Sequence, residues 1–167
     1  KAGGLKRSQD LIKENQALTF FKAGNFKEAE KIYRSLIEQG SQNYSVYANL
    51  AQISSMSGKN QEIAELLKKA IELNPKYVIG YFNLANVLKI QGDINSAITF
   101  YRKAINLDPN FYDANFNLAI TYQDQGDIEK AIISYKSSIR IKPNLTDAYI
   151  NLGLALKSKG DLNSAID

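Results

Sequence analysis

Asparagine recurs in this sequence at a constant interval of 34 residues. A side-chain amide holds donors and an acceptor side by side, so it can pair with the backbone of a bound peptide whatever the peptide's side chains are. The chain has 16 asparagines in 167 residues. Chance would fill such a column about once in several thousand random arrangements. The members of this asparagine column are Asn15, Asn49, Asn83, Asn117 and Asn151.

Histidine and cysteine are absent from the sequence. The chain therefore lacks the usual zinc ligands, the thiol nucleophile and the imidazole base on which most hydrolytic and metal-dependent sites rely. It also lacks a glycine-rich phosphate loop, a nucleophile elbow and a dinucleotide fingerprint. We predict that this chain is not an enzyme and holds no metal or cofactor. The lack of disulfides makes a cytoplasmic location the default expectation.

The composition indicates a folded chain, with 44% hydrophobic and 23% charged residues. The net charge of +4 comes mostly from residues 1–9, a basic N-terminal tail with three basic residues and no acid; 21 minus 3 leaves 18 basic against 17 acidic residues elsewhere. This charge distribution argues against nucleic acid as a partner, because phosphate binding needs clustered Lys and Arg. No apolar run approaches the length of a membrane span. We predict neither nucleic acid nor membrane as a partner.

Proline and glycine recur with the same 34-residue period, which indicates repeated supersecondary units. Each unit predicts two antiparallel helices, because apolar residues at offsets of 3, 4 and 7 flank a glycine suited to a left-handed C-terminal cap. A short polar residue then caps the second helix, and a proline ends it. The units are residues 10–43, 44–77, 78–111, 112–145 and a partial 146–167. The glycines are Gly24, Gly58, Gly92, Gly126 and Gly160, the capping residues Asn25, Asp93, Asp127 and Asp161, and the prolines Pro75, Pro109 and Pro143.

Small residues recur where the two helices of a unit must approach each other, and bulky residues face them. One repeat cannot bury its apolar face alone, so stability must come from stacking on neighbouring repeats. The small residues are Ala17, Ala51, Ala85, Ala119 and Gly153 in the first helices and Ala29, Ala97, Ala131 and Ala165 in the second helices. The bulky residues of the second helices are Tyr33, Leu67, Tyr101 and Tyr135.

The third unit resembles a complete tetratricopeptide repeat (TPR), and the resemblance covers residues 10–167. It implies an all-α fold, a right-handed superhelical solenoid of antiparallel helix pairs whose first helices line a concave groove. Members of the family mostly bind peptides or proteins and rarely perform chemistry. The array stops within a unit, so we expect a fragment of a longer protein. The residues that carry the resemblance are Tyr81, Leu84, Ala85, Leu88, Ala97, Tyr101, Ala104 and Pro109.

Polar and apolar side chains of the first helices are the predicted peptide-binding residues. First helices of adjacent repeats lie about 10 Å apart and an extended peptide rises about 3.3 Å per residue, so one asparagine would hold every third residue or so. The column is similar to the asparagine ladder of O-linked N-acetylglucosamine transferases. The predicted residues are Asn49, Asn83, Asn117, Asn151, Asn86, Phe82, Phe116, Ile120 and Ile150.

Two structural alternatives stand beside this interpretation. Asparagine at this position can simply tie neighbouring helices together, and Phe82 and Phe116 can pack between adjacent repeats. The basic clamp by which chaperone-binding members hold a C-terminal carboxylate has no counterpart here, since the groove positions hold Phe82, Phe116 and Ile150.

The sequence therefore predicts a non-catalytic protein–protein interaction module that holds an extended peptide or protein segment in its concave groove. One alternative is the substrate-recognition arm of a larger transferase, similar to a glycosyltransferase, whose catalytic domain lies beyond this sequence. Another is a self-assembling scaffold that associates through its truncated C-terminal helix.

Overall fold

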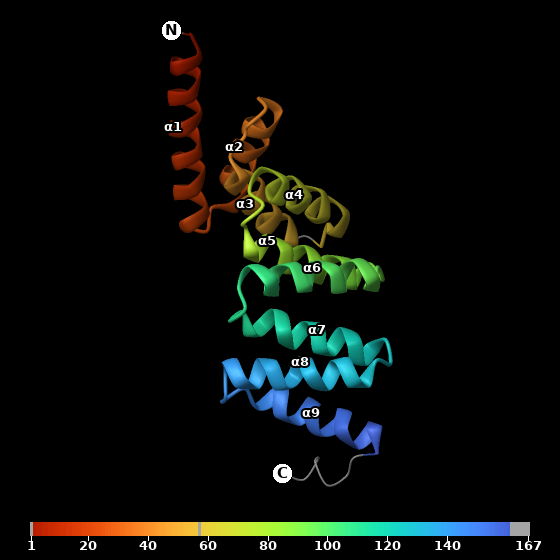
Figure 1. The fold of residues 1–167 in the computed structure, drawn as a ribbon. Coiled ribbons are helices and arrows are strands. Elements are labelled where there is room, and N and C mark those ends of the chain that lie inside the picture. Colours follow the sequence, from red (N-terminus) through yellow and green to blue (C-terminus); the bar gives the residue numbers. More distant parts are fainter. Residues whose placement is uncertain (1, 57, 161–167) are drawn as a thin grey trace. The chain divides into compact units, whose positions relative to one another are not determined.

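A computed structural model describes residues 2–56 and 58–160 of the chain (Figure 1). These residues form nine α-helices and no strand, which confirms the predicted all-α repeat class. The chain divides into two compact units, residues 1–80 and 81–167. The helices are α1 (Ala2–Lys22), α2 (Phe26–Glu38), α3 (Tyr44–Ser55), α4 (Asn60–Leu73), α5 (Val78–Ile90), α6 (Ile94–Leu107), α7 (Tyr112–Asp124), α8 (Ile128–Ile141) and α9 (Thr146–Lys159).

The turn between α5 and α6 forms as the sequence predicts. Gly92 has a φ of +84°, a left-handed conformation that glycine adopts without steric cost. Its N–H donates to the Lys89 carbonyl at 3.0 Å, and the next N–H donates to the Leu88 carbonyl at 2.9 Å. The carboxylate of Asp93 then accepts from the Ser96 N–H at 3.2 Å and caps α6. One helix is thereby ended and the next begun within a few residues.

The capping prediction is confirmed for two residues and needs one correction. Asp127 accepts from the Lys130 N–H at 3.3 Å, as Asp93 does in the preceding repeat. Asn25 holds the cap position of α2, but its side chain makes no capping hydrogen bond. Asp161 lies outside the described residues.

Helix α1 begins before the predicted first repeat. It runs over Ala2–Lys22, through the segment that we expected to form a separate tail. Residues 5–9 are Leu, Lys, Arg, Ser and Gln, and most of these types have good intrinsic helix propensity, so the helix extends beyond the 34-residue unit.

The first unit is built on close contacts between successive helices. Pairs α1–α2, α2–α3 and α3–α4 pack together, and Ala17, Ala29 and Tyr33 are almost completely buried among them. Arg34 contributes an ionic link, because its guanidinium lies 2.7 Å from Glu30 and 2.6 Å from Glu62. Its hydrogen bond lowers the pKa of Glu62, which ties α2 to α4.

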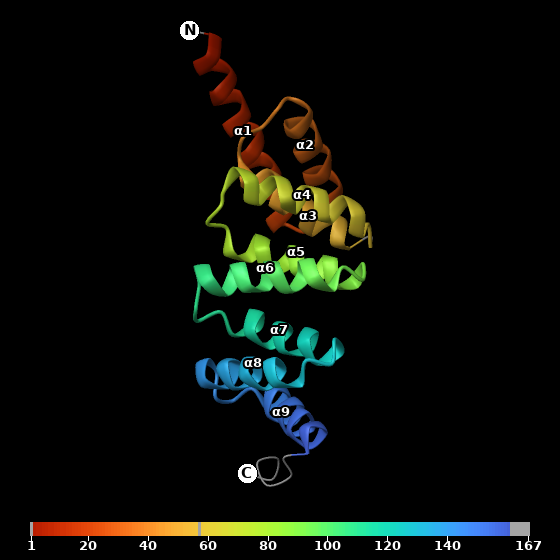
Figure 2. The same ribbon diagram turned by 45° about the vertical axis from the view of Figure 1, so that its right-hand side comes forward.

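The second unit repeats the same packing with successive layers α6, α7, α8 and α9 (Figure 2). Alanine lines the helix contacts as predicted, and the tyrosines that face it are buried with about 1% of their surface exposed. Gly153 is only half-buried, and Ala165 lies outside the described residues. The completely buried alanines of this unit are Ala85, Ala97, Ala104, Ala114, Ala119, Ala131, Ala148 and Ala155.

Gly80, in the first turn of α5, is a small residue that the sequence analysis did not single out. A Cβ atom there would lie 2.3 Å from Cδ1 of Tyr77 and 2.8 Å from Cγ2 of Ile71. The Tyr77 ring is held in place by the ring of Tyr44, whose centroid lies 5.0 Å away. Only glycine fits at this position unless the aromatic pair shifts.

We expect Gly80→Ala to lower the free energy of unfolding by about 1–3 kcal/mol, because the added methyl group overpacks the contact with Tyr77. Urea denaturation followed by circular dichroism measures the change. The same substitution in a Tyr77→Ala background serves as the control, since removing the ring relieves the clash and the two effects then fail to add. Equal or greater stability of Gly80→Ala with Tyr77 present would contradict this packing.

Candidate functional site

The predicted binding residues of the second unit lie on three first helices, α5, α7 and α9. On each helix two adjacent residues are followed by a third that lies three and four positions further on, which places them along one face of the helix. We call these residues, together with Leu154 at the matching position of α9, the first-helix face. It comprises Phe82, Asn83 and Asn86 on α5, Phe116, Asn117 and Ile120 on α7, and Ile150, Asn151 and Leu154 on α9. Asn49, on α3, is the predicted binding residue of the first unit.

Asn86 joins α5 to both of its neighbours in the second unit. The Tyr101 hydroxyl of α6 donates to Asn86 Oδ1 at 2.5 Å. Asn117 Nδ2 of α7 donates to the same oxygen at 3.0 Å. Two predicted site residues, Asn86 and Asn117, are therefore in direct contact. The hydroxyl of the buried Tyr101 holds Asn86 in place.

The asparagine column is not uniform. Asn49 Nδ2 donates to the Tyr33 hydroxyl at 2.9 Å, so this amide ties α3 to the preceding α2. Asn83 and Asn151 make no side-chain hydrogen bond within the part of the chain that the structure describes, and the Asn15 side chain is exposed. The structural alternative thus applies to Asn49 and in part to Asn117, whereas two amides remain available.

The residue 16 positions before each asparagine explains why some asparagines of the column form a hydrogen bond and others do not. Tyr33 occupies that position relative to Asn49, but the corresponding residue for Asn83 is Leu67, which has no hydroxyl. Tyr135 has the matching position for Asn151, yet its hydroxyl donates to Gln123 Oε1 at 2.8 Å instead. Whether an asparagine is hydrogen-bonded therefore depends on whether a tyrosine occupies that position and on which group its hydroxyl contacts.

The two phenylalanines of the first-helix face are half-buried by neighbouring rings. The Phe82 centroid lies 4.9 Å from that of Phe111 and 6.0 Å from that of Tyr101. The ring centroid of Phe116 lies 5.9 Å from that of Tyr135. These contacts lie within single repeats, 78–111 for Phe82 and 112–145 for Phe116, and both phenylalanines retain partial exposure.

The aliphatic residues of α9 are more exposed. Ile150 exposes 56% and Leu154 51% of its surface, whereas Ile120 of α7 is half-buried. Leu154 was not among the predicted binding residues, although the 34-residue period places it at the same repeat position as Asn86 and Ile120. An apolar row formed by Ile120, Ile150 and Leu154 therefore runs over α7 and α9, beside Asn86 and Asn117.

Charges near the first-helix face are partly neutralised. Lys89 Nζ lies 2.8 Å from the Asp124 carboxylate and joins α5 to α7. Asp113 and Asp147 make no ion pair among the described residues. Each lies in the first turn of its helix, where the helix dipole favours a negative charge. A basic clamp would need Lys89 free to bind a carboxylate of the ligand, but Lys89 is already paired with Asp124.

Burial keeps the tyrosines behind the first-helix face in their neutral form. It raises the pKa of Tyr101 to about 12. Burial also raises the pKa of Tyr135 to about 12, and the negative charge of Asp124 acts in the same direction. Both phenols therefore act as hydrogen-bond donors near neutral pH and have no role as bases.

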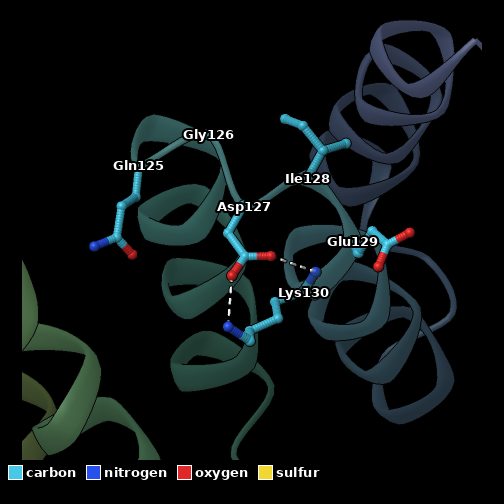
Figure 3. Close-up of a pocket in the computed structure, with 6 residues that line it drawn as sticks. All are labelled: Gln125, Gly126, Asp127, Ile128, Glu129 and Lys130. Atoms are coloured by element: carbon cyan, nitrogen blue, oxygen red, sulfur yellow. Dashed lines mark hydrogen bonds and ion pairs between the residues drawn. The ribbon is translucent and has the colours of Figure 1, made fainter.

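A shallow hollow lies at the turn between α7 and α8 (Figure 3). Its polar groups are engaged in the helix cap, because the Asp127 carboxylate accepts from both the backbone N–H and the side-chain Nζ of Lys130. The Lys130 hydrogen bond lowers the pKa of Asp127. The hollow is a consequence of the turn. Over the described ranges, no cluster of three metal-ligating side chains occurs and no helix is long and apolar enough to span a bilayer.

We expect the free energy of unfolding to fall as the pH rises from about 10 to about 12, because the unfolded state loses phenolic protons that the folded state retains. Below pH 10 or so this contribution is fully present. Tyr101→Phe/Tyr135→Phe should show a shallower decline, measured by guanidinium denaturation at several pH values over this range. Parallel declines for the variant and the wild type would contradict the role of burial.

Comparison with known proteins identifies the repeats. Family models described as TPR repeat match residues 85–126 and 121–160, and models described as tetratricopeptide repeat match residues 14–78 and 66–99. No curated protein sequence matches the chain.

Solved structures share the fold. Two crystal structures of MamA are 27% and 26% identical, with TM-scores of 0.84 and 0.86, over 90% and 94% of this chain and 88% and 86% of theirs. YrrB, described as a TPR protein with an unusual peptide-binding site, is 17% identical with a TM-score of 0.84, over 98% of this chain and 86% of its own. That last likeness shows the fold alone. The repeat matches and the helix pairs together establish that this chain belongs to the tetratricopeptide repeat family.

Proposed function

We propose that this chain is a non-catalytic protein-interaction module that binds an extended segment of a partner protein on the first-helix face of its second unit. The observation that carries the proposal is the exposed apolar row beside unengaged amides. Ile150 and Leu154 expose about half of their surface. Contiguous exposed apolar residues usually mark an interaction site.

The amides of the first-helix face supply the hydrogen bonds that an extended backbone requires. Asn83 and Asn151 make no hydrogen bond among the described residues, so both keep their donors and acceptor for a ligand. A backbone that leaves water must find such partners, because an unpaired buried amide is costly. The amides therefore favour an extended peptide over a purely apolar ligand.

The charges on this face favour a partner segment with apolar side chains. Lys89 is neutralised by Asp124 at 2.8 Å, so it is not free to hold a terminal carboxylate. The members of the first-helix face itself are aromatic, aliphatic or amide side chains. Apolar side chains of the partner would lie against Phe116, Ile150 and Leu154.

A matched pair of isoleucines tests the location of the binding surface. Ile150 on α9 and Ile133 on α8 are exposed to similar extents, 56% and 65%, but only Ile150 belongs to the first-helix face. Peptides are first selected from a random peptide display library on the full chain, and their affinities are measured by fluorescence anisotropy. We expect Ile150→Asp to weaken binding about tenfold or more and Ile133→Asp to have little effect.

The opposite ranking of these two variants, or equal affinities for both, would contradict the assignment. Failure of the wild-type chain to yield any binding peptide would contradict peptide binding as such.

A second test separates binding asparagines from structural ones. Asn83→Ala/Asn151→Ala should weaken peptide binding without lowering the urea midpoint, because neither amide holds another described residue. Asn49→Ala should instead lower the free energy of unfolding by about 1–3 kcal/mol, since it leaves the Tyr33 hydroxyl without its partner. Loss of stability in the double variant would show that these amides are structural as well.

A further inference from the structure

The second helices of the second unit, α6 and α8, carry an excess of positive charge. Together they hold five basic residues and one acidic residue, whereas α2 and α4, the second helices of the first unit, hold five basic and six acidic residues. The acidic residue, Glu129, is itself paired with Lys159 of α9 at 3.0 Å. The basic residues are separated along the chain by α7, so their sequence positions alone did not reveal a cluster. They are Arg102, Lys103, Lys130, Lys136 and Arg140.

Three of these cations are exposed and without an ionic partner. Arg102 on α6 and Lys136 on α8 occupy the same position of successive 34-residue repeats. Arg140 follows Lys136 by four residues, so both lie on the same face of α8. All three side chains are exposed, and none of them makes an ion pair with another described residue. Lys103 lies instead over the Tyr81 ring of α5, whose centroid is 5.8 Å from Lys103 Nζ.

Lys130 shows that the charges of α6 and α8 act on each other. Pairing with Asp127 raises the pKa of Lys130, whereas the positive charge of Arg102 acts in the opposite direction. Arg102 and Lys130 belong to different repeats, so the cations of the two helices share one surface. Like charges on one surface repel each other, and a negatively charged partner relieves that repulsion.

An exposed isoleucine lies among these cations. Ile133 exposes 65% of its surface. It precedes Lys136 by three residues and Arg140 by seven, which places it on the same face of α8. A phosphate backbone offers such a surface only negative charge, whereas an acidic protein segment offers carboxylates and an apolar side chain together. The isoleucine therefore favours a protein partner over a nucleic acid.

We propose that Arg102, Lys136 and Arg140, together with Ile133, form a docking surface for an acidic segment of a partner protein. We call these four residues the basic second-helix surface. Carboxylates of the segment pair with the three cations, and an apolar side chain between them packs on Ile133. Charge complementarity of this kind speeds association and selects acidic partners over basic ones. The surface shares no residue with the first-helix face, so this inference is independent of the proposed function.

Lys136→Glu and Lys68→Glu form a matched pair of variants. Lys68 occupies the same repeat position on α4, is exposed and makes no ion pair with another described residue. Both substitutions change the net charge equally, but only Lys136 belongs to the basic second-helix surface. The probe is a peptide selected on the full chain from a display library rich in aspartate, glutamate and leucine. By fluorescence anisotropy, we expect Lys136→Glu to weaken binding about tenfold or more and Lys68→Glu to have little effect.

Two further measurements separate lost charge pairing from lost folding. The urea midpoint of Lys136→Glu should equal that of the wild type, because the new carboxylate lies four residues before Arg140, an orientation that stabilises a helix. Sodium chloride should weaken the wild-type complex more than the Lys136→Glu complex, since salt screens exposed charges. Arg102→Gln/Arg140→Gln, which removes charge without reversing it, should also weaken binding of the probe.

The two isoleucines distinguish this surface from the first-helix face. Ile133→Asp should weaken binding of the acidic peptide and Ile150→Asp should not, which reverses the ranking expected for peptides of the first-helix face. Equal affinities of Lys136→Glu and Lys68→Glu, or no binder from the acidic library, would overturn the basic second-helix surface and leave the proposed function intact. Tighter binding of a mixed-sequence single-stranded DNA than of the acidic peptide, with the same dependence on Lys136, would overturn the assignment to a protein segment.

Discussion

Close approach of neighbouring helices over alanine is the constraint on which the rest of this structure depends. Ala97, Ala104 and Ala119 are completely buried, so the backbones on either side lie as near as a methyl group allows. A single helix pair of this length cannot hold itself together, and stability comes from successive contacts of this kind. Larger residues at these points would separate the helices and remove the support of every side chain packed beyond them.

Buried tyrosines connect the packed core to the asparagines of the first helices. Tyr33 and Tyr101 are held by the core with about 1% of their surface exposed, yet each hydroxyl reaches an asparagine of a first helix. Of the polar groups of the first-helix face, Asn86 is consequently oriented by the core, and Asn117 is linked to it. Such preorganisation lowers the entropy cost of binding, since the amides need not be ordered by the ligand.

The sequence was sufficient to predict the helices, their turns and most of the buried positions, because glycine, aspartate and alanine act locally or through a fixed period. The capping by Asp93 and the burial of Ala119 are examples. The behaviour of the asparagine column was not predictable in the same way. Whether an amide is engaged depends on a phenol 16 positions earlier and on where its hydroxyl points, and Tyr135 shows that the residue type alone does not decide this.

The turn between α5 and α6 has a consequence for the modularity of the chain. Its backbone and capping hydrogen bonds join residues 87–97 to one another, and a side chain added at Gly92 would meet no atom within 4 Å. The turn of a helix hairpin is thus closed by residues of the hairpin itself and needs no contact with the rest of the protein. Duplication or deletion of a 34-residue segment leaves such a turn intact, which makes array length an evolvable and designable quantity.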